Sequence, residues 1–319
     1  HGLAALLNNH PGTTRQLSAL LNEHFGRAVG EGLNRGGSFL AELISHLDPV
    51  VLSQAADANP TMMRDLLAKL DARLGKAVAG AINSDASFLV ELLANLSPET
   101  CKAMAEGTNL NTSGFMEELL ANLDTSVAEA AGDALGANPG LIKNLISNLK
   151  ADTGVRMAEA SNANPDLMGV LMENLAPATA EAMAEGLNAS ASQNPGFLYQ
   201  LLSNMNSETG AAIGRGMNAM AASGASSALY ATLMGTERHT VETLANALEA
   251  NIPFLNAMIQ SLDTAALGPA ISSGLDPEKS DFLVELLANM DEQGLANIMN
   301  SAEGQNLTNQ LVANLDGSL

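Results

Sequence analysis

The sequence predicts an all-α fold: an α-solenoid, a superhelical stack of about twelve short helical-hairpin repeats of about 27 residues. Three observations support this prediction. One nine-residue phrase recurs along the chain, its apolar residues have helical spacing, and helix-capping residues precede it. The clearest copies are FLVELLANL at 88–96, FMEELLANL at 115–123 and FLVELLANM at 282–290. Repeats of this length are typical of stacked units rather than of separate globular domains.

The repeats predict a single array over residues 1–319. The phrase ends near residues 21, 47, 70, 96, 123, 149, 175, 205, 237, 262, 290 and 315. Segment 206–262 has longer steps and is rich in Gly, Ala and Ser, so we expect a kink or an inserted turn there.

Each phrase reads as a Leu-rich helix, which we call helix B. Its apolar residues occupy positions 1, 2, 5, 6 and 9, and that spacing forms one wide helical face. Residues that accept hydrogen bonds stand three positions before the phrase, where they predict N-caps, and Pro often follows them. These predicted caps are Asn59, Asp85, Thr112, Asn138, Asn164, Asn194 and Asn251.

A second, Ala- and Gly-rich helix follows each helix B, and we call it helix A. Examples are KAMAEG at 102–107 and EAMAEG at 181–186. Small residues would let neighbouring backbones approach closely, and stacked hairpins would bury the Leu faces. An Asn recurs thirteen residues after the end of several helices B. Because Asn tolerates the left-handed conformation that ends many helices, we expect helix A to end at this Asn. The predicted stops are Asn34, Asn83, Asn109, Asn162, Asn188 and Asn218.

Another Asn series precedes the last apolar residue of helix B. The amides either bond carbonyl groups at the turn into helix A or form a ladder that binds a polymer or peptide, and recurrence at a helix end favours the structural role. The series is Asn95, Asn122, Asn148, Asn174, Asn204, Asn289 and Asn314. The fifteen methionines fall mostly at apolar positions, which predicts core filling, with an adaptable apolar groove as the alternative.

The best candidate binding site is a series of acids at the fourth position of helix B: Glu42, Asp65, Glu91 and Glu118. In stacked hairpins with ordinary helix spacing, these side chains would form a row with neighbours about 10 Å apart. Such a row would recruit a basic segment or cations. The competing interpretation is a solvated helix face.

Composition excludes several classes of protein. The chain has 14 Lys and Arg against 35 Asp and Glu, a formal charge of −21, so it would repel nucleic acid. One Cys excludes disulfide frameworks and Cys-rich zinc modules.

Cys101 lies near a predicted helix start, which would lower its pKa, but burial is its expected role. The only notable His–acid pair is Glu42 with His46. We find no catalytic motif, metal pattern, cofactor loop or apolar run that could span a membrane.

The sequence therefore predicts a non-enzymatic interaction scaffold without a cofactor. It would present a superhelical surface to a protein, a peptide or a surface polymer. One alternative is a carrier of a hydrophobic ligand in an apolar channel, and a weaker one is a protein that self-assembles end to end. Low Lys and Arg content and a single Cys lean towards a secreted or cell-surface location. Because residue 1 is His, we expect the chain to be a piece of a longer protein.

Overall fold

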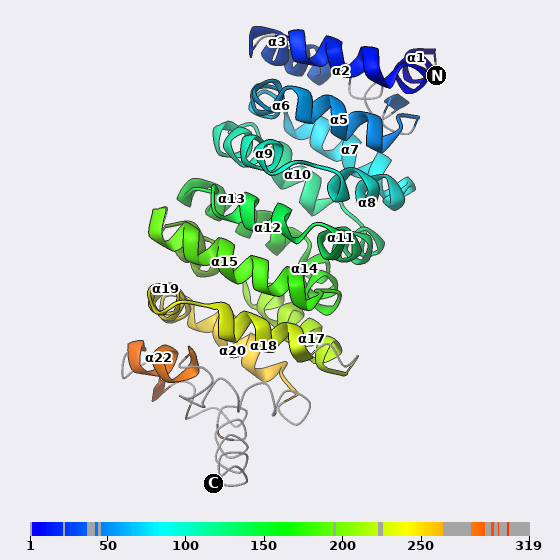
Figure 1. Cartoon of the computed structure of the whole chain (residues 1–319). Helices are drawn as coiled ribbons and strands as arrows, with labels where there is room; N and C mark the ends of the chain where they lie inside the picture. The colour runs from blue at the N-terminus through cyan, green and yellow to red at the C-terminus, as the bar shows by residue number, and fades with distance from the viewer. Residues whose placement is uncertain are drawn as a thin grey trace.

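The computed structural model describes residues 2–21, 23–36, 42–43, 46–193, 196–222, 226–263 and 282–290, with residues 295, 296, 299 and 305. The described chain is helical, as expected, and its only strand-like pairing is an isolated bridge between Asp71 and Gly114. The helices form an elongated stack with α1–α3 at one end and α20 and α22 toward the other (Figure 1).

The two predicted helix types alternate along the chain. The helices B are α2 (Pro11–Leu20), α6 (Pro60–Leu67), α8 (Ala86–Ala94), α10 (Phe115–Ala121), α12 (Pro139–Ile146), α14 (Pro165–Glu173), α16 (Gly196–Asn204), α18 (Ser226–Gly235), α20 (Ile252–Gln260) and α22 (Phe282–Asn289). The helices A are α3 (Glu23–Arg35), α5 (Pro49–Ala58), α7 (Ala72–Ser84), α9 (Pro98–Leu110), α11 (Thr125–Ala137), α13 (Ala151–Ala163), α15 (Pro177–Gln193), α17 (Ser207–Ala222) and α19 (Arg238–Glu249). Helix α1 (Gly2–Asn9) precedes them.

Each helix packs mainly against the helix three positions further along the chain. Three columns result: α3–α6–α9–α12–α15–α18, α7–α10–α13–α16–α19–α22 and α2–α5–α8–α11–α14–α17–α20. Consecutive helices, the two arms of each predicted hairpin, touch only slightly. The packing unit is therefore a turn of three helices rather than a closed hairpin, and every described helix A except α3 and α7 lies between two helices B in its column.

The core forms where the columns join. Positions 1 and 9 of the repeated phrase are buried, as in phrase 88–96, where Phe88 of α8 and Leu96 just after it are 7% and 6% exposed. The small residues of helix A allow close approach, as expected. A Cβ atom on Gly154 of α13 would lie 2.5 Å from the Phe197 carbonyl oxygen of α16. The two backbones are so close at this point that only Gly, which has no Cβ atom, fits there.

The Asn residues near the ends of the helices A bind the turns of the next layer. In α9, the Asn109 amide nitrogen donates to the Asn148 carbonyl at 2.7 Å, and its oxygen accepts from the Lys150 N–H at 3.0 Å. We call such residues turn clamps. The other Asn turn clamps are Asn8, Asn34, Asn83, Asn162, Asn188 and Asn218. Asp57 makes the accepting half of the clamp with the Ser97 N–H at 3.0 Å.

The predicted helix stops are right in place at four of these Asn residues, because α3, α7, α9 and α13 each end one residue after the Asn. Helices α15 and α17 continue past Asn188 and Asn218, and the predicted left-handed cap is wrong at every position. Asn109 lies within α9, and no described residue other than Gly has a positive φ. The recurrence that suggested a left-handed cap reflects a long-range pair of hydrogen bonds instead. Each pair satisfies one donor and one acceptor of a turn that follows a helix B.

A second Asn series stands at the bend from helix A into helix B. Asn138, with φ −135° and ψ 70°, donates to the Leu93 and Leu96 carbonyls at 3.0 and 3.1 Å. We call these residues corner asparagines. Each one binds the carbonyls at positions 6 and 9 of an earlier helix B. They are Asn59, Asn111, Asn138, Asn164 and Asn251.

The predicted N-caps are confirmed in part. Asn59 and Asn251 accept from the Met62 and Phe254 N–H groups at 3.1 and 3.3 Å. Asp85, Asn138 and Asn164 hold the N-cap position without a side-chain cap bond. Thr112 is not a cap, because α10 starts at Phe115 after Gly114, and Asn194 lies outside the described residues.

Helices α15 and α17 explain the longer steps of the sequence around residue 206. They have 17 and 16 residues, against 13 in α7, α9, α11 and α13. Ser190 and Met220 stand two residues after turn clamps, where the corner Asn would stand, and the helix continues through both positions. Within segment 206–262, the longer helix α17 stands where we expected a kink or an inserted turn, and α15 is lengthened in the same way before that segment.

Candidate functional site

The four predicted acids lie in different surroundings. Asp65 of α6 is 2% exposed, and its Oδ1 atom lies 3.0 Å from Arg64 and 4.0 Å from Arg27 of α3. Glu42 is exposed and lies 3.5 Å from His46, while Glu91 of α8 is exposed. Glu118 of α10 accepts from its neighbour Asn122 at 3.1 Å.

The columns explain why Asp65, Glu91 and Glu118 do not form the expected row of close neighbours. Helices α6, α8 and α10 belong to three different columns, because three helices complete one turn. Neighbours about 10 Å apart would require successive helices B to pack on each other, and they do not. A binding role for Glu42, Asp65, Glu91 and Glu118 stays a prediction, but the acids would have to act separately.

Ion pairs between helices follow the columns instead. Each one in the described chain joins a helix to the helix three positions later. Lys143 of α12 lies 2.7 Å from Glu185 of α15, and Arg215 of α17 lies 3.2 Å from Asp166 of α14. Arg238 of α19 lies 3.2 Å from Glu285 of α22. These pairs are largely exposed, so each one contributes little stability, but they follow the same packing.

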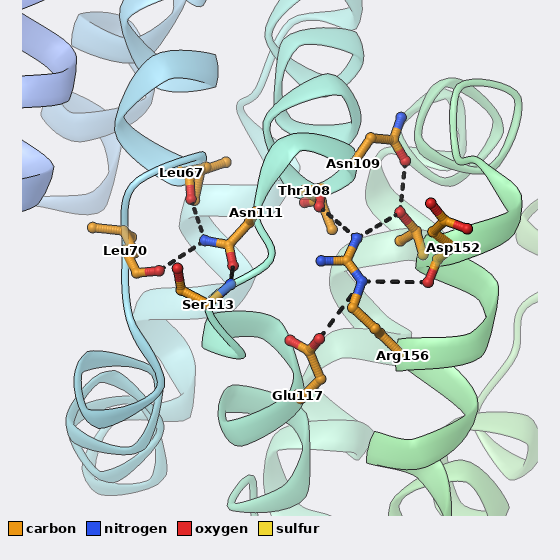
Figure 2. A network of polar contacts seen from close by, with 10 residues as sticks. Leu67, Leu70, Thr108, Asn109, Asn111, Ser113, Glu117, Asp152 and Arg156 are labelled. Carbon is orange, nitrogen blue, oxygen red and sulfur yellow. Dashed lines mark hydrogen bonds and ion pairs between the residues drawn. The ribbon is translucent and has the colours of Figure 1, made fainter.

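A half-buried polar cluster surrounds Arg156 of α13, which is 18% exposed (Figure 2). Its guanidinium donates to the Thr108 carbonyl at 3.0 Å and to Thr153 Oγ1 at 3.0 Å, and it lies 3.6 Å from Glu117 of α10. Glu117 Oε2 is buried without a partner. The adjoining cavity of about 10 Å³ has room for about one water molecule. The cluster ties α9, α10 and α13 together, and the sequence analysis missed it.

The Asn residues before the last apolar residue of helix B have the structural role that we expected. Their amide nitrogens donate to the carbonyl four residues earlier, as Asn174 does to Val170 at 2.8 Å. The carbonyl lies in the same helix rather than across the turn. The same bond is made by Asn95, Asn122, Asn148, Asn204 and Asn289, whereas Asn314 lies outside the described residues.

Cys101 of α9 is buried at 1% exposure, as expected. Its predicted acidification is wrong. Burial, with a smaller contribution from the Asp57 carboxylate, raises the pKa of the thiol to about 11. The cost of desolvating a thiolate exceeds the benefit of a helix N-terminus. A nucleophilic role for this thiol therefore has no support.

Large apolar side chains are exposed mainly at the N-terminal end of the stack. Five of the nine in the described chain belong to α1, α2 and α3, which have no described helix three positions before them. Leu20 is 82% exposed, and Leu6 is 58% exposed. The five residues are Leu3, Leu6, Leu17, Leu20 and Phe25.

Other site types gain little support. An open hollow of about 570 Å³ lies between α16 and α19, lined by Gly196, Tyr199, Thr243 and Asn246. This hollow is not an enclosed apolar channel. The described residues contain no group of three His, Cys, Asp or Glu side chains that could hold a metal ion. None of the described helices alone has the length and apolarity to cross a membrane, although the bent pair α7–α8 meets that test by length and composition.

Comparisons with known proteins do not indicate a family for this chain. No protein-family model matches the chain, and no curated protein or solved structure shows a significant similarity to it.

Proposed function

We propose that this protein is a non-enzymatic interaction scaffold, an α-solenoid of about twelve units that binds a basic protein segment along its outer surface. The main support is the regular stack, in which turn clamps tie successive layers and leave the outward helix faces to solvent. Extended, rigid surfaces of this kind suit long partners.

The distribution of charge supports a basic partner. Residues 1–80 hold seven Lys and Arg and seven Asp and Glu, whereas residues 81–319 hold seven and 28. The whole formal charge of −21 therefore lies beyond residue 80. Exposed acids of neighbouring helices in one column, Glu129 and Asp133 of α11 with Glu173 of α14, face solvent there. Such a field favours association with cations and weakens with salt.

The test is fluorescence anisotropy of a labelled oligolysine peptide against the protein. We expect Glu129→Gln/Asp133→Asn/Glu173→Gln to weaken binding about tenfold and to reduce its salt dependence. The matched control is Glu42→Gln/Glu91→Gln/Glu118→Gln, which also removes three negative charges but at other positions. A larger loss in this second variant would favour the acids predicted from sequence. If neither variant changes binding, or if the peptide does not bind, the proposal that the partner is a basic segment is wrong.

Self-association is a second candidate function, favoured by the exposed leucines of α1 and α2. Covering such faces with another chain would remove them from water, which is favourable by about 25 cal/mol per Å². Multi-angle light scattering should then show a mass that rises with concentration. Leu6→Ser/Leu17→Ser should abolish that rise, and a constant monomer mass in the unmodified protein would exclude this function. Native mass spectrometry of the same sample tests for a ligand carried by the protein.

A further inference from the structure

One turn of the stack lacks both kinds of Asn contact. It follows α14 and comprises residues 174–176. Gly136 of α11 stands where its turn clamp would be, thirteen residues after Leu123, and Met220 stands where its corner asparagine would be. Every other described turn from a helix B into a helix A has at least one of the two.

Two polar groups at this turn have no hydrogen-bond partner within the described protein. The Ala176 N–H has no hydrogen bond in the described chain, while the equivalent N–H of Asp124 donates to Asn83 at 2.9 Å. Thr179 is fully buried, and its Oγ1 atom has no partner. The equivalent Thr153 donates to Asn109 at 2.8 Å. The missing side chain at Gly136 accounts for both groups.

Met220 takes the place of a corner asparagine on the other side of the turn. Met220, at 2% exposure, packs with Leu175 and Ala180 in one core cluster. Apolar contact is non-directional, so it resists sliding less than a pair of hydrogen bonds at fixed positions does. The layer contact between α11 and α15 therefore has neither a turn clamp nor a corner asparagine at this turn.

We infer that the stack bends at the turn between α14 and α15, by opening of the edge between α11 and α15. The turn clamps and corner asparagines on either side keep the neighbouring layers together during this motion. The bend is a property of the chain alone and does not depend on the proposed scaffold function. A failure to bind oligolysine would therefore leave it intact.

Pulsed electron–electron spin resonance tests the bend with two matched label pairs in a Cys101→Ala background. Asp133→Cys with Glu181→Cys spans the unclamped turn, and Gly80→Cys with Glu129→Cys spans the equivalent turn clamped by Asn83. All four positions are exposed. We expect the first distance distribution to be about twice as broad as the second, since its edge opens. Adding Gly136→Asn should narrow it, and Gly136→Ala should not. Equal widths for the two pairs would overturn the inference.

Residue-resolved hydrogen exchange provides a second test on the unmodified chain. The Ala176 amide and the amides of the following turn of α15 should exchange at least about tenfold faster than those after Asp124 and Asn206. Gly136→Asn should restore protection across this stretch. Equal protection at the three turns in the unmodified protein would contradict the inference, whatever the label distances show.

Discussion

The layers from α7 to α14 and the layers containing α15 and α17 are built from the same two helix types but differ at the corners. In the first region, Asn111, Asn138 and Asn164 end a helix A and bind an earlier turn. In the second, Ser190 and Met220 cannot make both bonds, and the helices run on for three or four more residues. In these three layers the corner asparagine therefore stands where the helix A ends and also binds the layer to an earlier turn.

Removing a corner asparagine from the regular region should have the largest effect. Asn111 is 1% exposed and donates to the Leu67 and Leu70 carbonyls at 2.6 and 2.8 Å (Figure 2). Asn111→Ala should lower the free energy of unfolding by about 3 kcal/mol, because two buried acceptors lose their donor. Urea denaturation measures the change. Asn95→Ala, which loses one exposed bond within its own helix, should cost under about 1 kcal/mol.

The pH-dependence of protein stability tests whether the Cys101 thiol stays buried in the regular region at high pH. Its pKa is raised to about 11, so the folded state holds the proton more tightly than the unfolded state. This stabilisation is complete below the unfolded pKa of 9.0 and is lost as pH rises from there through about 11. The pH-dependence of stability should differ between the native protein and Cys101→Ala by up to about 1.4 kcal/mol per pH unit in this range. Parallel pH curves would mean that the thiol reaches solvent.

Close approach between layers should be the next most sensitive feature. Gly154→Ala places a Cβ atom 2.5 Å from the Phe197 carbonyl, so a backbone must shift, at a cost of about 2 kcal/mol. Gly80 of α7 has open space at its Cβ position. Gly80→Ala should therefore stabilise the protein by about 0.5–1 kcal/mol through helix propensity. Thermal unfolding of the two variants should shift in opposite directions.

Restoring the missing turn clamp should make the irregular region resemble the regular one. A Cβ at Gly136 would meet only Ala176 at 3.5 Å, an ordinary contact. Gly136→Asn should stabilise the protein by about 1–2 kcal/mol, combining new hydrogen bonds with better helix propensity. Gly136→Ala isolates the propensity. No difference between the two variants in urea unfolding would show that the clamp does not form.

The smallest expected change is at Ser190. Its hydroxyl is fully buried in α15 and lacks a partner. Ser190→Ala should raise stability by about 0.5 kcal/mol, since a buried polar group without a hydrogen bond is removed. A loss of stability in urea unfolding would mean that the hydroxyl makes a bond, and the contrast with the corner asparagines would weaken.

Helical periodicity was sufficient to predict the helices, because the apolar positions of helix B are local in sequence. The packing could not be predicted the same way. Asn109 and its partner Lys150 are 41 residues apart, more than one repeat, and nothing in a single repeat indicates that distance. The same missing information led us to expect a row of close neighbours from Glu42, Asp65, Glu91 and Glu118. The burial of Asp65 against α3 follows from the columns alone.

The ratio of two helices per unit to three helices per turn has a consequence for how such an array can grow. Duplication or loss of a whole unit leaves every helix A against a helix B, because helices three apart are always of opposite type. Each added unit nevertheless turns all later units by two thirds of a revolution. Equivalent side chains return to the same side only every third unit, as in α10, α16 and α22. A tandem duplication of three units would extend a binding surface in line, while a single duplication would redirect it.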